Sequence, residues 1–292
     1  MHLSTFSIVA VDRTTGELGI AVASKFLAVG AVVPWARAGA GAVATQSYAN
    51  VSYGPRGLEL LAAGLSASET LERLIADDPE RALRQVGIVD ARGGAATFTG
   101  SGCHAWAGGR TGPGYAVQGN ILTGPEVVDA MVQAFESTSG PLAARLLAAL
   151  FAGDRAGGDR RGRQSAALLV VAERGGYGGY TDRAIDLRVD DHVDPVAELR
   201  RLYDIWRLYF EKPDPADRLP LRGDLLVELQ EAMRALGYYE GPAHGQWDEA
   251  TRRAYATLIG NENFEERIPL DADWIDRAVL EYIRSLVQRR SG

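Results

Sequence analysis

The segment STFSIVAVDRTTGELGIAVAS, residues 4–24, contains two apolar runs on either side of a polar turn. Both runs are rich in residues that favour strands. Thr15 and Gly16 lie between the runs and suit the tight turn of a β-hairpin. The segment therefore predicts an antiparallel strand pair, with Thr5 at the head of the first strand.

Strands and pairs of helices alternate over the rest of the first 210 residues. The segment 30–47 carries Pro34 and several glycines, and it predicts short strands broken by bends. Two helices are expected over 55–84, where Ser66 lies three residues before Glu69 and predicts a capping box. Further strands are expected at 84–90, 95–100, 114–122, 165–173 and 180–190, and further helices at 124–138, 141–153 and 194–210. This order predicts a layered α+β domain over 1–211.

The end of the chain has a different pattern. Three prolines fall within EKPDPADRLP (211–220), so a linker is expected at 212–220. Apolar residues then recur at helical spacing in 223–239, 247–260 and 271–287, the last through Ile275, Val279, Tyr282 and Leu286. The sequence therefore predicts a small all-α domain of three helices over 221–292.

Composition excludes several classes of function. The 292-residue chain has a formal net charge of -7, which disfavours binding to nucleic acid or to an anionic membrane. Its single cysteine, Cys103, rules out an internal disulfide, and its four histidines lack metal-ligand spacing. No secretory signal is visible, and no apolar run approaches the roughly 20 residues of a membrane span. We therefore expect a cytoplasmic protein with no metal or other cofactor.

Several stretches together resemble a known family. TFSIVAVD, YGPRGLELLAAGLSA, RQVGIVD, WAGGRTGPGYAVQGNIL and GGDRRGRQSAALLVV follow, in order and spacing, the motifs of the bacterial domain-of-unknown-function family 1028. The resemblance covers residues 4–210. That family is in turn similar to the N-terminal nucleophile (Ntn) hydrolases, which implies a four-layer αββα sandwich. It also implies sheets that pair into homo-oligomers.

The tail resembles a second family. LQEAMRALGYYEGPAHGQWDEATRRAYATLIG is similar to the three-helix peptidoglycan-binding-like domain, through Leu229-Gln230, Gly237-Tyr238 and Thr251. His244 stands where that pattern usually has an aspartate before the turn glycine. The resemblance implies peptidoglycan or a protein partner for 221–292.

The Ntn resemblance makes Thr5 the candidate nucleophile. In that chemistry one residue attacks an amide carbon while its own α-amine takes the proton, so the amine must be unblocked. The four residues MHLS precede Thr5, and His2 is too large for ordinary removal of the initiator methionine. Cleavage of the Ser4–Thr5 bond is therefore required. The alternative is that Thr5 only begins a strand, and Ser7, on the same strand face, is a weaker rival nucleophile.

Two further segments could assist catalysis. Ser24 and Lys25 end the second strand, where a lysine would lower the pKa of a nearby nucleophile or amine. Asn120 follows Gly119 at a strand end and could stabilise an oxyanion, an effect often worth about 3 kcal/mol. The alternatives are a solvated lysine and an ordinary turn asparagine.

A glycine-rich loop could hold the substrate. GDRAGGDRRGRQSAAL (153–168) contains Arg160 and Arg161, whose planar guanidinium groups suit a carboxylate or a phosphate. Gln164 and Ser165, where the loop becomes a strand, could contact the same ligand. The alternative is a flexible hinge. Elsewhere, Cys103 and His104 are neighbours that would point to opposite faces of a strand, so a structural cysteine is expected.

These residues lead to two hypotheses. The first is a metal-free hydrolase that cleaves an amide bond of a small, carboxylate-bearing molecule. The second is a non-catalytic ligand-binding or scaffold protein, with the tail as an interaction module. A third interpretation is attachment to the cell wall through the tail.

Overall fold

The computed structural model describes residues 5–291, and the chain divides into two compact units between Leu202 and Tyr203. The division falls within helix α5 (Pro195–Phe210), ahead of the end expected at residue 211. The segment 212–220 is more ordered than a plain linker, because it holds a 3₁₀ turn at Pro215–Asp217 and strand β11 (Arg218–Pro220). Each unit is described by itself below.

The first unit is a mixed α/β structure with two antiparallel sheets. The six-stranded sheet has the order β10-β9-β2-β1-β8-β7, and the four-stranded sheet has the order β3-β4-β5-β6. Their bounds are β1 Thr5–Val11, β2 Leu18–Ser24, β3 Pro34–Arg37, β4 Gly41–Ser47, β5 Arg84–Asp90, β6 Ala95–Thr99, β7 Gly108–Gly112, β8 Tyr115–Asn120, β9 Ser165–Val171 and β10 Arg183–Val189. The expected hairpin is confirmed, since β1 pairs with β2 throughout their lengths.

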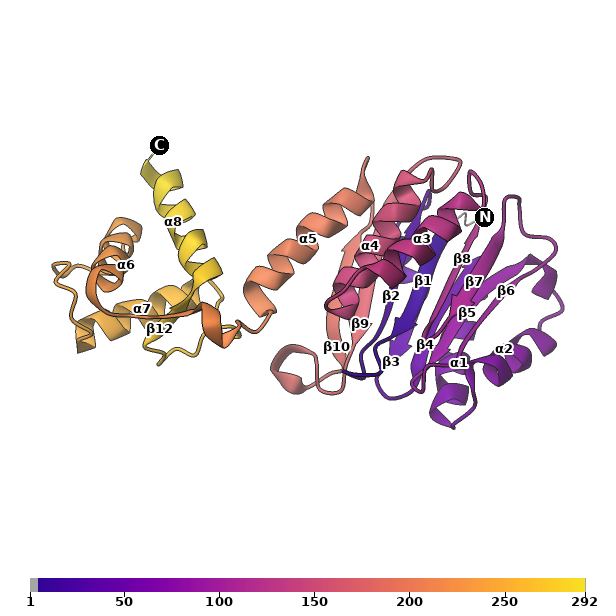
Figure 1. Ribbon diagram of the computed structural model, residues 1–292, viewed down its shortest axis with the longest axis horizontal. Coiled ribbons are helices and arrows are strands. Elements are labelled where there is room, and N and C mark those ends of the chain that lie inside the picture. The colour runs from indigo at the N-terminus through magenta and orange to yellow at the C-terminus, as the bar shows by residue number, and fades with distance from the viewer. Residues whose placement is uncertain (1–4, 292) are drawn as a thin grey trace. The chain divides into compact units, whose positions relative to one another are not determined.

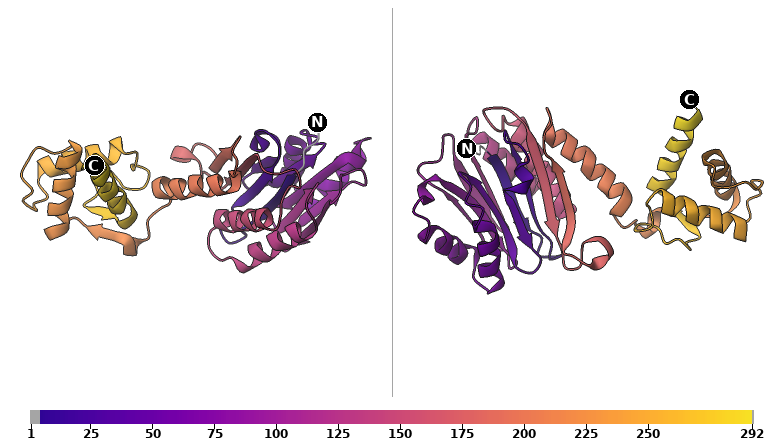
Figure 2. Two further views of the ribbon diagram at one scale, coloured as in Figure 1. Left: turned by 90° about the horizontal axis from the view of Figure 1, so that it is seen from above. Right: turned by 180° about the vertical axis from the view of Figure 1, so that it is seen from behind.

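Two pairs of helices cover the outer faces of the sheets (Figure 1, Figure 2). Helices α1 (Tyr53–Ala62) and α2 (Ala67–Ala76) lie against the four-stranded sheet. Helices α3 (Glu126–Ser137) and α4 (Leu142–Arg155) lie against the six-stranded sheet. The predicted capping box forms, because the Ser66 hydroxyl accepts from the backbone N–H of Glu69 and the Glu69 carboxylate accepts from that of Ser66.

An apolar core fills most of the space between the sheets. Val9, Ile20 and Val22 of the larger sheet meet Ala44 and Val89 of the smaller one, and all are buried. Side chains alternate between the two faces of a strand, so Thr5 and Ser7 point the same way as Val9. The inter-sheet layer is therefore apolar in its middle and polar at the end where β1 begins.

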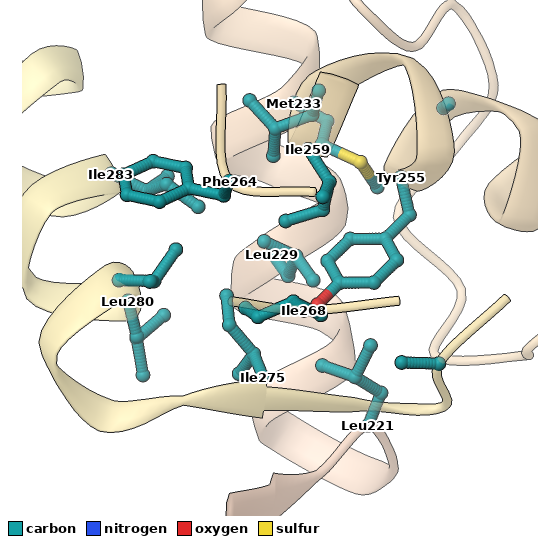
Figure 3. Close-up of a cluster of buried hydrophobic side chains, with 14 of the residues drawn as sticks. Leu221, Leu229, Met233, Tyr255, Ile259, Phe264, Ile268, Ile275, Leu280 and Ile283 are labelled. Carbon is teal, nitrogen blue, oxygen red and sulfur yellow. The ribbon is translucent and has the colours of Figure 1, made fainter. Parts of the chain in front are cut away.

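The second unit has its own apolar core, shown in Figure 3. Helices α6 (Gly223–Leu236), α7 (Glu249–Asn261) and α8 (Arg277–Ser291) surround Leu229, Tyr255 and Phe264. The unit is not all-α, because β11 pairs with β12 (Trp274–Asp276) as a two-stranded antiparallel ribbon. The prediction that Ile275 belongs to the last helix was therefore wrong, because Ile275 lies in β12. Ile275 is buried from the ribbon and the helix begins at Arg277.

Candidate functional site

Thr5 lies between two of the predicted site residues. In the sheet register it is opposite Ser24 of β2 on one side and Asn120 of β8 on the other. All three residues are buried, and Thr5 Oγ1 donates to Ser24 Oγ at 3.3 Å. The fold thus brings together a hydroxyl at a strand head, a second hydroxyl and an amide from three neighbouring strands.

Three buried glutamines that we did not predict as site residues surround this group. Gln46 comes from β4, Gln85 from β5 and Gln118 from β8, and none is exposed. Gln46 Nε2 donates to the carbonyl oxygen of Thr5 at 3.2 Å, and its Oε1 accepts from the Ser7 hydroxyl at 2.6 Å. In the sequence, each of them is a polar residue within an otherwise largely apolar strand segment: GAVATQS, RQVGIVD or YAVQGN. Buried amides in such runs need partners, which here are one another and the site.

Gln85 fixes the orientation of the Asn120 amide. Its Nε2 donates to the carbonyl oxygen of Gly119 at 2.7 Å and to Thr99 Oγ1 at 2.9 Å. Its Oε1 must then face the other way, where it accepts from Asn120 Nδ2 and from Gln46 Nε2, both at 2.9 Å. Because Gln85 offers an acceptor, Asn120 presents its nitrogen to Gln85, and the amide cannot turn over without losing this bond.

Gln118 occupies space that a glycine leaves open. A Cβ atom at Gly87 of β5 would lie 2.0 Å from Gln118 Oε1, so a side chain at this position would displace the amide. In the space left, Gln118 Nε2 donates to Ser7 Oγ at 2.7 Å. Ser7, the rival nucleophile, is therefore held between Gln46 and Gln118.

Two residues at the same end of the sheets have left-handed backbone conformations. Ser47, which follows Gln46, has φ of 71°, and Ile121, which follows Asn120, has φ of 51°. Such conformations cost about 1–3 kcal/mol for residues other than glycine and cluster at functional sites. For a β-branched residue such as Ile121 the conformation is rarer still. Backbone strain is thus stored beside Asn120.

The arginine loop is braced by the chain's own aspartates. Arg161 binds the buried Asp159 at 3.1 Å and also donates to the carbonyl oxygen of Lys25 at 3.1 Å. Asp159 in turn accepts from the backbone N–H of Lys25 at 2.7 Å. Arg163 binds Asp154 through two hydrogen bonds, and these raise the pKa of Arg163. Arg160 is exposed, and its backbone N–H donates to the carbonyl oxygen of Ile121 at 3.0 Å.

The remaining predicted site residues, Lys25, Gln164 and Ser165, lie next to Ser24, but their side chains do not contact Thr5 or Asn120 in any hydrogen bond that the structure shows among residues 5–291. The Lys25 side chain is exposed. The backbone N–H of Gln164 donates to the carbonyl oxygen of Ser24 at 3.1 Å, while its side chain donates to Asp191. The buried Ser165 hydroxyl donates to the carbonyl oxygen of Phe26 and accepts from the backbone N–H of Val29 at 3.1 Å. Ser165 therefore fastens the loop that follows β2.

A cavity of about 430 Å³ lies beside Ser24. Its walls include Phe6 and Ala23, which alternate with Thr5 and Ser24 along their strands, and the ion pair of Asp154 with Arg163. By that alternation the cavity opens towards the face of the sheet that α4 covers, which is opposite to the face that Thr5 points to. The arginine loop and Ser24 thus share this cavity, whereas Thr5, Asn120, Arg160 and Arg161 do not line it.

Asp78 ties the neighbouring loop to β5. Its buried carboxylate accepts from Arg84 Nε at 2.9 Å, from Asn50 Nδ2 at 3.1 Å and from the Tyr53 hydroxyl at 2.8 Å. Burial alone would raise the pKa of this carboxyl, but these hydrogen bonds outweigh burial and hold the pKa well below its usual range. Because Arg84 is opposite Ser47 in the sheet, this cluster supports the strand that carries Gln46.

Metal-binding clusters and membrane-spanning helices are both absent from the part of the chain that the structure describes. Within residues 5–291, no three His, Cys, Asp or Glu side chains gather in a way that could hold a metal ion. Over the same part of the chain, no helix has the length and apolar character needed to cross a membrane. Burial raises the pKa of the Cys103 thiol, which donates to the carbonyl oxygen of Arg84 at 3.4 Å.

Comparison with known proteins assigns the first unit to a family. The model of a family of unknown function, DUF1028, matches residues 5–199. The chain belongs to the DUF1028 family. A solved structure of a DUF1028 protein from Silicibacter pomeroyi is similar, with 33% sequence identity, a TM-score of 0.65 and coverage of 75% of this chain and 92% of that chain. The expected family is therefore confirmed.

The second unit matches a different family model, described as "Putative peptidoglycan binding domain", over residues 209–283. No curated protein matches this DUF1028 chain. The match to DUF1028 begins at Thr5, the head of β1, and ends within α5, so it covers both sheets and all of the candidate site. The comparisons thus give a family and a fold relative, and neither carries an activity.

Proposed function

We propose that the DUF1028 unit is an amide hydrolase of the Ntn type, and that its sheets and helix pairs form a four-layer αββα sandwich of that class. The observation that carries the proposal is the position of Thr5. It heads an inner strand of the larger sheet, between Ser24 and Asn120, at the polar end of the inter-sheet layer. A nucleophile that uses its own α-amine needs such a place, where a strand begins and its first residue is surrounded by hydrogen-bonding groups.

The proposed reaction uses groups of this chain. Thr5 Oγ1 attacks the amide carbon, and its proton passes to the α-amine of Thr5. The amine then protonates the leaving nitrogen as the C–N bond breaks, which leaves an ester on Thr5. A water molecule hydrolyses the ester and restores the hydroxyl. This route requires cleavage of the Ser4–Thr5 bond, and Ser4 lies outside the described residues.

Asn120 and Lys25 have supporting roles in this proposal. Asn120 donates to the oxyanion, an interaction worth about 3 kcal/mol in comparable sites. Its amide is already held by Gln85, so little reorganisation is needed during the reaction. Lys25, which follows Ser24, adds positive charge near the strand end and favours a neutral amine on Thr5.

The proposed substrate is a small molecule that bears a carboxylate next to the amide bond. Of the two arginines assigned to it, Arg161 is braced by Asp159, so we assign the substrate carboxylate to the exposed Arg160. In this proposal Ser24, which lines the cavity, and Gln164, whose backbone binds Ser24, contact the substrate, and Ser165 holds the loop after β2 beside them. In this proposal the carboxylate of the substrate contacts Arg160, and the carbonyl group of its amide lies at Thr5 Oγ1.

Intact-mass measurement of the purified full-length protein is the first test. We expect the mass of a chain that begins at Thr5, and we expect a β-lactone probe to add to that residue. Thr5→Ala is expected to abolish both probe addition and hydrolysis of a panel of N-acyl amino acids. Thr14→Ala, an exposed turn threonine, serves as the matched control. A chain that keeps residues 1–4 and still splits amides would require another nucleophile.

A second candidate function is a non-catalytic ligand-binding or scaffold protein. It is favoured by the contacts of Thr5, whose buried hydroxyl donates to Ser24 as an ordinary strand residue would. In that case a ligand bound by the wild-type chain would bind equally well to Thr5→Ala and Asn120→Ala, and no amide in the panel would be hydrolysed.

We also propose that residues 221–292 bind peptidoglycan or a protein partner and that the protein forms homo-oligomers. The family match of the second unit supports the first proposal. Sedimentation with purified peptidoglycan sacculi tests it, with bovine serum albumin as the non-binding control. Analytical ultracentrifugation over a range of concentrations tests the second.

A further inference from the structure

The second unit contains a cavity of about 730 Å³. It is bordered by the last two turns of α5, the 3₁₀ turn at Pro215–Asp217 and the first turns of α8. This volume lies within the range of about 300–1,000 Å³ that small-molecule sites usually have. The cavity lies wholly within the second unit, in residues 204–281, so the proposed hydrolysis does not involve it.

Asp276, a buried residue in the wall of this cavity, has one carboxylate oxygen that accepts hydrogen bonds from the protein and one that does not. Asp276 is 1% exposed. Its Oδ1 accepts from Arg267 Nη2 at 2.9 Å and from the backbone N–H of Ala278 at 3.0 Å. Its Oδ2 accepts no hydrogen bond from any residue in 5–291, and Asp276 lines the cavity. A carboxylate oxygen can accept two bonds, so Oδ2 is an acceptor in the cavity wall that has no donor among the residues 5–291.

Arg267 does not satisfy that oxygen. Its Nε and Nη2 both donate to Oδ1 of Asp276, at 3.1 and 2.9 Å. Its Nη1 donates to the carbonyl oxygens of Arg207 and Glu211, at 2.6 and 2.7 Å. The guanidinium therefore anchors the end of α5 and one oxygen of Asp276, and Oδ2 is left for a donor in the cavity.

The charge around the cavity favours a cation. Its lining holds more carboxylates than cations, and the cations are already engaged. Arg207 binds Glu211 at 2.9 Å, Arg277 binds Asp217 at 3.4 Å, and Lys212 Nζ donates to the carbonyl oxygen of Glu266 at 2.6 Å. The exposed Glu281 accepts no hydrogen bond from any residue that the structure describes, so its charge stays available at the rim. The lining carboxylates are Asp204, Glu211, Asp214, Asp217, Asp276 and Glu281.

We propose that this cavity binds a primary ammonium group carried on an aliphatic stem, such as a lysine-type side chain. The ammonium would donate to Asp276 Oδ2 and face Glu281, while the alkyl stem lies against Leu208, Pro213 and Ala278, which also line the cavity. An ammonium is a compact charge with three donors, and it suits a single acceptor oxygen better than a planar guanidinium does. A bare metal ion fits less well, because no cluster of three ligands exists within residues 5–291.

The test measures binding of small probes to the full-length protein by NMR titration. Nα-acetyl-L-lysine methylamide is expected to bind at least about tenfold more tightly than Nα-acetyl-L-norleucine methylamide, which has a similar stem and no ammonium. A third probe, 1,5-diaminopentane, separates the two sources of this chemistry. Affinity equal to that of the lysine probe indicates a free amine, and weaker affinity indicates a peptide. Equal binding of the lysine and norleucine probes overturns the proposal.

Two variants locate the site. Asp276→Asn is expected to weaken binding of the lysine probe by about tenfold or more, and Glu281→Gln by about threefold. Glu240→Gln, an exposed glutamate of the same unit that does not line the cavity, is expected to change nothing. Because Asp276→Asn leaves Arg267 buried opposite a neutral group, it could unfold the unit, and Glu281→Gln then decides alone. Unchanged affinity in Glu281→Gln, or in a folded Asp276→Asn, overturns the assignment.

Discussion

At the scale of single residues, the polar end of the inter-sheet layer is held by side-chain amides. Gln46, Gln85 and Gln118 are fully buried and satisfy one another together with Ser7, Thr99 and Asn120. Removing one member leaves its buried partners without bonds, and that cost exceeds the worth of the lost bond. The same network that stabilises the fold also orients the candidate oxyanion donor.

Gln85→Leu tests this network. The substitution removes the acceptor of two amide donors, Gln46 Nε2 and Asn120 Nδ2, and we expect the free energy of unfolding to fall by about 3 kcal/mol. Gln133→Leu makes the same change at an exposed position of α3 and should cost less than about 0.5 kcal/mol. Urea unfolding at pH 7 gives both values, and a loss in Gln85→Leu as small as in the control would contradict a stabilising role of these hydrogen bonds.

Asp78 gives the stability a pH dependence of known sign. Its pKa is held below the unfolded value of about 3.9, so its contribution is complete above that value and is lost as the pH falls towards the folded pKa. Asp78→Asn should therefore be less stable than the wild type at pH 7, by a difference that shrinks as the pH is lowered from 5 to 2.5.

Asp77→Asn is the matched control for this titration. Asp77 is the neighbouring residue, largely exposed, and its ion pair with Arg56 lies at the surface. Its difference from the wild type should stay small throughout the same urea titrations. A difference between Asp78→Asn and the wild type that grows on acidification would mean that the Asp78 hydrogen bonds do not form.

At the scale of elements, the packing of β5 against β8 depends on the absence of a side chain at Gly87. Both strands contribute to the inter-sheet layer, and the Gln118 amide occupies the position where a Cβ atom at Gly87 would lie. The close approach is a matter of packing between sheets. It therefore cannot be recognised from the strand pattern of either segment.

Gly87→Ala is expected to displace Gln118 and to break its bond to Ser7, at a cost of about 1–3 kcal/mol. Gly260→Ala should have the opposite sign. Gly260 lies in helix α7, and a Cβ atom there would approach only Leu270, at 4.0 Å. In a helix, alanine is more stable than glycine by about 0.5–1 kcal/mol. Thermal unfolding of both variants provides the comparison, and a neutral Gly87→Ala would show that Gln118 has another position available.

At the scale of the whole molecule, the chain has two separate apolar cores. Leu74 belongs to the core beneath α1 and α2, and Leu229 belongs to the core of the second unit. Because each unit has its own buried core, we expect each to unfold as a cooperative block, and we do not expect two-state behaviour for the full chain. The two family matches, over 5–199 and 209–283, divide the chain in a similar place.

Differential scanning calorimetry should therefore show two transitions. Leu74→Ala and Leu229→Ala remove the same groups from fully buried positions, and each should cost about 2–5 kcal/mol. Leu74→Ala should lower only the transition of the first unit, and Leu229→Ala only that of the second. One transition that moves in both variants would show that the units unfold together.

The sequence by itself determined the local elements and the family. The hairpin at 5–24, the two helix pairs and the capping box at Ser66 follow from turn residues, spacing and caps, all of which act over a few residues. The DUF1028 motifs were also legible in the chain and are confirmed by the match over 5–199. The roles of the predicted site residues stay predictions.

Only the tertiary structure decided which polar groups meet. It placed Asn120 opposite Thr5, brought in three glutamines from three strands, and bound Arg161 and Arg163 to aspartates of the same loop region. It also paired β11 with β12, whose three-residue lengths are too short to show an alternating pattern. Partners in a sheet or a buried network come from distant parts of the chain. Which residues become partners depends on how the sheets pack. The periodicity of the sequence reflects only neighbouring residues, so it does not predict these distant partners.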